Sequence, residues 1–184
     1  EWHAAAIVWL EFVPPAGADA EAVFEILAAV MPAIPGIVNE HGGHVVHRQN
    51  GLTAVFGAQA THEDDTVQAL LAASQILRHV SSTATSGQSR FGLKLAVSLG
   101  KVVAGKVGSP ATAEFVVIGE PVQEARRLAE RAPVDTAWVS SAVRAATGHV
   151  GVFKSWPTTA GSGQEDRTAW ELIGIRERPG QARG

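Results

Sequence analysis

The hydrophobic positions of this chain change their spacing several times, and each change predicts a new element. Residues 4–13 (AAAIVWLEFV) are apolar except for one carboxylate, which is typical of a buried strand. Apolar residues then recur at helical spacing as far as about residue 40, and Asp19 is placed to cap the start of that helix. Because Pro32 and Pro35 interrupt the helical pattern, we expect two helical segments.

The rest of the chain alternates between strand and helix spacing. Asn50-Gly51 is a strong hairpin signal, and Thr61 with Asp64 resembles the capping pair at the start of a helix. In order, we expect strands at 45–46 and 52–56 joined by a turn at 48–51, a helix from about 61 to 80, a polar loop at 81–89, and strands at 91–99, 101–105 and 114–118. A helix at 121–132, a strand at 137–139, a short helix from 141, and strands near 152 and at 168–173 complete the series.

This order of elements predicts a mainly antiparallel sheet with helices on one face. A chain of 184 residues can form one domain with a substantial core, whereas two domains would be cramped. We therefore assign residues 1–175 to a single domain and residues 176–184 to a tail or linker. Because the chain begins at Glu1 and not at a methionine, we expect it to be a domain of a longer protein.

Composition narrows the class of protein. With 46% hydrophobic and 18% charged residues the chain reads as globular, and a net charge of -3 without a basic block argues against binding to duplex nucleic acid. The absence of cysteine excludes disulfides and thiolate metal sites and favours a cytoplasmic location. We see no run of the roughly 18 apolar residues that a membrane span needs, and therefore expect no membrane segment.

Five segments, in unbroken order, carry a family resemblance. They are a Gly-Gly pair at 42–43 before a hairpin that ends in AVFGA (54–58), HEDDTVQALLAASQIL (62–77), FGLKLAVSLGKVVAGKVG (91–108), FVVIGEPVQEARRLAERA (115–132) and WVSSAV (138–143). Together they resemble the catalytic domain of the class III adenylate and guanylate cyclases over nearly the whole chain. Diguanylate cyclases also have a Gly-Gly pair near a hairpin. Here the pair precedes the hairpin and no acidic residue follows it, so the diguanylate cyclase interpretation fits poorly.

The resemblance implies an α+β fold with a ferredoxin-like βαββαβ core, a mainly antiparallel sheet, flanking helices and a C-terminal αβ extension. It also implies a site at a dimer interface, where two divalent ions activate the 3′-hydroxyl of a nucleoside triphosphate to attack the α-phosphate and release pyrophosphate. In the family two aspartates hold the ions. In the other subunit a lysine and an Asp or Thr read the base, an asparagine orients the ribose, and an arginine stabilises the transition state.

The metal and phosphate positions depart from the family pattern. The two aspartates align with Glu11, which is longer by one methylene, and Asn50, whose amide adds no charge, so we expect weak metal binding. The family's Gly-Phe-Thr phosphate loop aligns with Pro14-Pro15-Ala16, and the two prolines remove two N–H donors. The alternative interpretation is a strand glutamate with a local partner and an ordinary hairpin turn.

The nucleotide positions are kept only in part. The base-reading lysine aligns with His47 and the Asp/Thr position with Val116, which offers no hydrogen bond to a purine. His44 and His47 should point to opposite faces of their strand, so we do not expect a zinc site there. The asparagine aligns with Gln123 and the arginine with Arg127, which share a helix face as the mechanism requires. The adjoining Arg126 is the other residue that could take the arginine position. A solvated or interface arginine is the alternative for Arg127.

Three hypotheses follow. The first is a catalytically degenerate cyclase homology domain with a regulatory or dimerisation role in a larger signalling protein. The second is an active, divergent adenylate or guanylate cyclase that uses Mg²⁺ or Mn²⁺ and makes a cyclic nucleotide and pyrophosphate from a nucleoside triphosphate. The third is a ligand-binding module that uses the altered cleft. As partners we expect a second copy or another cyclase-type domain, other domains of the parent protein, and no nucleic acid.

Overall fold

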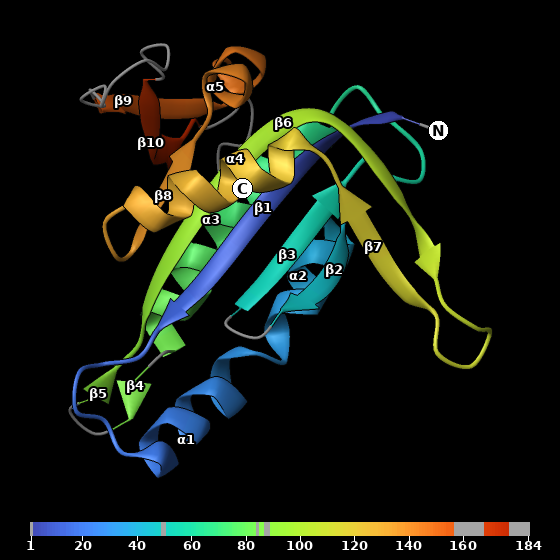
Figure 1. Cartoon of the computed structure of the whole chain (residues 1–184). Helices are drawn as coiled ribbons and strands as arrows, with labels where there is room; N and C mark the ends of the chain where they lie inside the picture. The colour runs from blue at the N-terminus through green and yellow to red at the C-terminus, as the bar shows by residue number, and fades with distance from the viewer. Residues whose placement is uncertain (1, 49–50, 84, 87–88, 157–167, 177–184) are drawn as a thin grey trace, which may run out of the picture.

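The computed structural model is built on one large sheet around β1 (His3–Val13), the first predicted strand (Figure 1). It describes residues 2–48, 51–83, 85–86, 89–156 and 168–176. The strand order is β2-β3-β1-β6-β8-β10-β9, and β7 pairs with the far part of β6. Neighbours are antiparallel except β6 and β8. The strands are β2 (His44–Arg48), β3 (Gly51–Phe56), β6 (Gly92–Val107), β7 (Glu114–Ile118), β8 (Thr136–Val139), β9 (Gly151–Trp156) and β10 (Ala169–Ile175).

The first four strands of that order, with the helices between them, form the expected ferredoxin-like βαββαβ core, and the later elements extend it. The predicted α+β fold is confirmed. The helices are α1 (Ala20–Val30), α2 (Ala33–Glu40), α3 (Asp65–Thr83), α4 (Glu120–Arg131) and α5 (Ser141–Thr147).

The expected division of the first helical segment is also confirmed. Asp19 caps α1, since its Oδ1 accepts a hydrogen bond of 2.8 Å from the N–H of Ala22. α1 ends at Met31, and Pro32 stands at the N-cap of α2, where a missing N–H donor is harmless. Pro35 lies in the first turn of α2 and does not break it.

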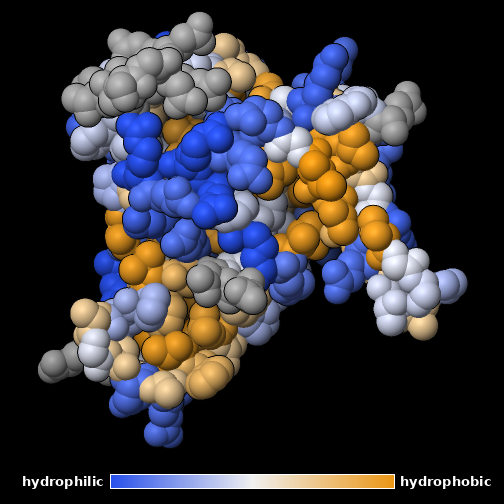
Figure 2. Space-filling model, viewed as in Figure 1, coloured by the Kyte–Doolittle hydropathy of each residue, from blue (hydrophilic) through white to orange (hydrophobic). Residues whose placement is uncertain are grey.

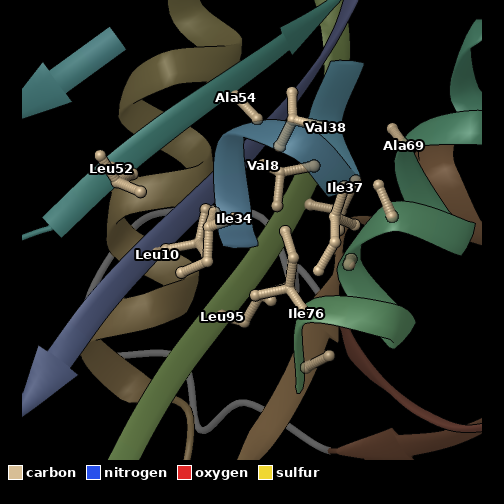
Figure 3. Close-up of a cluster of buried hydrophobic side chains, with 14 of the residues drawn as sticks. Val8, Leu10, Ile34, Ile37, Val38, Leu52, Ala54, Ala69, Ile76 and Leu95 are labelled. Carbon is tan, nitrogen blue, oxygen red and sulfur yellow. The ribbon is translucent and has the colours of Figure 1, made fainter. Parts of the chain in front are cut away.

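The main core lies between the sheet and the helices α1, α2, α3 and α5. Every second residue of β1 (Ala6, Val8 and Leu10) points into it, as the period of a strand requires. Figure 3 shows Val8 and Leu10 of β1 meeting Ile34 and Ile37 of α2 and Ile76 of α3. The alternate residues of β1 face the other way.

A second, smaller core lies on that opposite face, beneath α4. Ala5 and Ile7 of β1 pack there with Val55 of β3 and Ala125 of α4. In Figure 1, α4 lies on one face of the sheet and α3 on the other. The expectation that all helices lie on one face is therefore wrong. The apolar stripe of α4 consists of small residues, so its pattern alone did not indicate which face it covers.

One long strand replaces the two expected around Gly100. β6 runs unbroken from residue 92 to residue 107, and its far part forms a ribbon with β7 that extends beyond the sheet (Figure 1). The break expected between residues 99 and 101 does not occur, because Gly100 and Gly105 both lie inside the strand. Only Gly108, with φ of 124°, lies at the turn into β7.

Two local predictions about α3 are wrong. Thr61 does not cap the helix, because its hydroxyl donates to the carbonyl oxygens of Ala4 and Gly57. Asp65, the first residue of α3, instead holds the preceding segment in place, because its Oδ2 accepts a hydrogen bond of 2.6 Å from the N–H of His62. The segment expected to be a loop, 81–89, contains the end of α3 and the paired strands β4 (Thr85–Ser86) and β5 (Ser89–Arg90). The turn residues 49–50, most of the loop at 155–166, and the tail beyond Arg176 lie outside the described residues.

The segment Ala20–Glu40 meets the length and composition of a membrane span, with a mean hydropathy of 1.7. Because this criterion rests on length and composition alone, the expectation of no membrane segment stays a prediction. Core helices pass the same test. Ile34 and Val38 of α2 are fully buried against the sheet, so we describe α1 and α2 as core helices.

Candidate functional site

Glu11, Gly51 and Arg48 form one row across three neighbouring strands. Gly51 of β3 is paired with Glu11 of β1 on one side and with Arg48 of β2 on the other. Directly paired residues of antiparallel strands share a face, so Glu11 and Arg48 project from the face that carries Trp9. Gly51 has no side chain, and Arg48 can therefore reach across β3 toward β1.

Arg48 is held in place by three hydrogen bonds and a stacked ring. Its Nε donates to the hydroxyl of Thr53 at 2.8 Å. Its Nη2 donates to the carbonyl oxygens of Leu10 at 2.7 Å and Leu52 at 3.1 Å. The guanidinium carbon lies 3.3 Å from the centroid of the Trp9 ring, which is a cation–π contact. Together these contacts fix the positive charge at the ends of β1 and β3.

The glycine at position 51 is required for this arrangement. A Cβ atom at Gly51 would lie 2.0 Å from the carbonyl oxygen of Leu10, the same atom that accepts a hydrogen bond from Arg48. Any side chain there would push the strands apart and would compete with Arg48 for the Leu10 carbonyl.

Positive charge dominates this part of the sheet. Burial lowers the pKa of Arg48 to about 10, with the negative charge of Glu11 opposing that effect and the positive charge of Arg126 adding to it. Arg48 therefore stays protonated at neutral pH. On the other side of Glu11, its partner in β6 is Lys94, whose Nζ donates to the carbonyl oxygen of Glu130 at 3.2 Å.

A cavity of about 510 Å³ opens at the ends of β1 and β3, where α1 covers them. Its lining is mainly apolar, with Phe12 and Leu27 among the larger side chains. Glu11, His47 and Arg48 supply the polar groups. The size suits a small organic ligand.

The structure places two of the predicted site residues at the cavity, on opposite faces of the sheet, and leaves the others apart. Glu11 and His47 both line the cavity. His47 and His44 lie on opposite faces of β2, as expected, because their partners Leu52 and Val55 belong to different cores. Asn50, the second predicted metal position, lies outside the described residues.

Gln123 and Arg127 lie on the exposed side of α4, away from the lining of this cavity. They share a helix face as predicted, and Arg127 forms an ion pair of 2.5 Å with Glu120. Val116 lies on β7, paired with Gly105 of β6, and does not line the cavity. Nothing in the arrangement within one chain tests the roles expected of these three residues.

Arg48 and Lys94, which flank Glu11 in the sheet, were not predicted as site residues from the sequence. Arg48 was assigned to the hairpin turn, and Lys94 was given no role. For Arg48, the sequence signal was its position three residues before Gly51 in a short hairpin. Its place in the site follows from the register of the hairpin with β1, which cannot be read from the local sequence.

The divalent ions that the resemblance implies do not fit the described residues. Among residues 2–48, 51–83, 85–86, 89–156 and 168–176, no group of three His, Cys, Asp or Glu side chains lies close enough to hold a metal ion. Glu11 is the carboxylate of the cavity, and a fixed guanidinium is its neighbour. Pro14, at the start of the expected phosphate loop, lines the cavity without an N–H donor.

Comparison with solved structures shows which known fold this chain shares. No protein-family model matches the chain. The guanylate cyclase domain of RhGC from Catenaria anguillulae, solved in complex with GTP, matches with a TM-score of 0.83 at 13% identity, covering 96% of this chain and 100% of that one. The adenylyl cyclase CyaB from P. aeruginosa gives 0.81 at 15% identity, covering 97% and 96%. A dimeric guanylyl cyclase domain of the RhoGC fusion protein from Blastocladiella emersonii gives 0.79 at 14% identity, covering 96% and 99%.

This chain has the class III nucleotidyl cyclase fold. Two curated relatives with closer sequences are the uncharacterized proteins Rv1320c of Mycobacterium tuberculosis and Mb1354c of Mycobacterium bovis. Each is 42% identical over 98 residues, which is 52% of this chain. The chain spans about 16% of the length of these relatives. The cyclase fold thus accounts for the arrangement of the elements.

Proposed function

We propose that this chain is a nucleotidyl cyclase homology domain that has lost cyclase catalysis and serves in assembly or regulation within a larger protein. The observation that carries the proposal is the donor set of the cleft. Glu11 there has a fixed Arg48 as its neighbour, and the described residues contain no group of three His, Cys, Asp or Glu side chains that could hold a metal ion. Cyclisation by two divalent ions needs oxygen ligands that hold both ions in defined geometry.

The prolines after β1 support the same proposal. A phosphate-binding loop uses consecutive backbone N–H groups, and proline has none. The N–H of Ala18 is already bonded to the carbonyl oxygen of Pro15, at 3.2 Å. This segment is therefore poorly equipped to hold a triphosphate.

Dimerisation through the β6–β7 ribbon is the second part of the proposal. Val103 is directly paired with Ile118, and Gly105 with Val116, so these residues share one face of the ribbon. Ile118 is 65% exposed and Val107, on the same face, 64%. Figure 2 shows hydrophobic side chains gathered on the surface near β7. An apolar face of this kind fits a second copy or another cyclase-type domain.

A direct assay tests the loss of catalysis. Purified protein is incubated with ATP or GTP and with Mg²⁺ or Mn²⁺, and the cyclic nucleotide is measured by chromatography, with an active cyclase domain as the positive control. We expect no cyclic product. Clear turnover that Arg127→Ala abolishes would contradict the proposal and would support an active, divergent cyclase.

A second candidate is supported by the exposed side of α4. Gln123 and Arg127 are exposed there, and by exchanging its ion pair with Glu120 this chain can offer Arg127 to the site of a partner subunit. Mixing it with a cyclase domain that lacks its own arginine, and then with the Arg127→Ala variant, tests this role. Cyclic product in the first mixture and none in the second would favour it. Nucleotide binding without metal and without turnover would instead favour a ligand-binding module.

A further inference from the structure

The charged side chains that neighbour Glu11 in the sheet are basic. Arg48 lies in the same row as Glu11, two strands away, and Lys94 is its direct partner on the other side. Arg126 of α4 lies close enough for its charge to act on Arg48. No described residue forms a hydrogen bond or an ion pair with the Glu11 side chain. Glu11 thus has Lys94 as its direct partner on one side and Arg48 beyond Gly51 on the other, whereas Arg126 is ion-paired with Glu130 at 2.8 Å.

The guanidinium of Arg48 is not free to swing away from this place. Its Nε and Nη2 are occupied by Thr53 and by the carbonyl oxygens of Leu10 and Leu52. Its flat face rests on the ring of Trp9. An exposed arginine would move aside for an incoming ion, but here such a move would break three hydrogen bonds and one stacking contact.

A divalent ion at Glu11 would lie on the same face of the sheet as this fixed charge. A guanidinium repels the ion and has no lone pair with which to ligate it. The repulsion is strengthened because Arg48 is half-buried and poorly screened by water. Mg²⁺ also requires near-octahedral oxygen ligands, which one glutamate does not supply.

We propose that Arg48 takes the place of a divalent metal ion in this cleft: its fixed guanidinium supplies the positive charge beside Glu11 and keeps Mg²⁺ and Mn²⁺ out. This inference rests on the loss of catalysis proposed above. It explains that loss by a residue of this chain that excludes the metal ions. Its test measures ion binding and involves no turnover.

Titration with Mn²⁺, followed by electron paramagnetic resonance, measures the exclusion. We expect Arg48→Met to bind Mn²⁺ at least about tenfold more tightly than the unchanged chain, because a unit charge beside the ion is removed. Adding Glu11→Gln to that variant should return the affinity to the starting level. Arg144→Met is the matched control, since Arg144 also stacks on a tryptophan, Trp170, but lies on α5. It should leave Mn²⁺ affinity unchanged.

Tb³⁺ emission sensitised by Trp9 shows whether the ion bound by Arg48→Met lies beside Glu11. Excitation of tryptophan sensitises Tb³⁺ emission only when the two lie close together, and Trp9 stays in place when Arg48 is replaced. We expect sensitised emission in Arg48→Met that is lost when either Glu11→Gln or Trp9→Phe is added. Emission that persists in both double variants would place the ion elsewhere and would overturn the proposal.

Each variant is first compared with the unchanged chain by circular dichroism and thermal unfolding. If Arg48→Met does not fold, Arg48→Gln removes the charge and keeps hydrogen-bonding groups, and the same tenfold gain is expected. Equal Mn²⁺ affinities in the charged and neutral folded chains would overturn the inference while the proposed loss of catalysis stands. Cyclic product from the unchanged chain would contradict the proposed function whatever the titration shows.

Discussion

Gly100 of β6 and Pro121 of α4 are in direct contact, since a Cβ atom at position 100 would lie 2.6 Å from the Cγ of Pro121. Two residues earlier in the strand, the buried hydroxyl of Ser98 donates to the carbonyl oxygen of Pro121 at 2.5 Å. These two contacts seat the first turn of α4 on the sheet. The position of Arg127 on the same helix therefore depends on a residue with no side chain.

Replacing Gly100 by alanine should destabilise the fold. The added methyl would overlap Pro121, and overpacking of this kind costs about 1–3 kcal/mol of the free energy of unfolding. Gly105→Ala, in the same strand, is the control. Its Cβ would meet nothing within 4 Å, so the change should stay within about 0.5 kcal/mol. Urea unfolding of both variants measures the difference, and equal losses would contradict the contact.

A charge on the β6–β7 ribbon should weaken self-association. Ile118→Glu places a carboxylate in the exposed apolar face, where it would lose its hydration in a dimer. Ile173→Glu, on β10, replaces an isoleucine of similar exposure outside the ribbon and should leave association unchanged. Sedimentation velocity over a range of concentrations measures the dimer. If both variants behave alike, the ribbon is not the interface.

The stability contributed by Arg48 should depend on pH only in the alkaline range. Its pKa in the folded chain is about 10, below the ordinary value of 12.5, because burial disfavours the charge. Above pH 10 the unfolded chain holds the proton more tightly than the folded chain, so the folded state gains stability as the pH rises. The difference in free energy of unfolding between the unchanged chain and Arg48→Met should be constant below pH 9 and should increase in favour of the unchanged chain above pH 10. A flat difference up to pH 11 would contradict this.

Restoring the family's residues at four positions should not restore cyclase activity. The four changes are Glu11→Asp, Asn50→Asp, His47→Lys and Val116→Asp. Pro14 and Pro15 would still remove backbone donors from the phosphate loop, and Arg48 would still repel a metal ion. Cyclic product from this quadruple variant, measured as above, would show that the prolines and Arg48 matter less than the four side chains.

Local patterns predicted the elements wherever the physical cause was itself local. The apolar run at residues 4–13 corresponds to β1, and Asp19 and Pro32 mark the start of α1 and the end of its helical run. The predictions failed where a distant partner decided the outcome. Thr61 bonds to Ala4 across the sheet and does not cap the helix beside it.

The residues of the candidate site were likewise predicted from the sequence only in part. Sequence resemblance pointed to Glu11 and His47, which the fold does bring to one cavity. It did not point to Arg48, because the importance of that residue comes from its register. Arg48 is paired with Gly51, which has no side chain to block it. The guanidinium of Arg48 therefore extends across β3 and stacks on the ring of Trp9 in β1.

The sequence by itself determined the element types and the α+β class, because strand and helix periods and proline breaks act within a few residues. Only the tertiary structure decided that α4 covers the second face of the sheet, that Gly100 is a contact and not a turn, and that Arg48 lies over Trp9 beside Glu11. Each of these depends on which strands are neighbours and in which register. Strand pairing is a long-range choice made by the whole core, and no local stretch of residues encodes it.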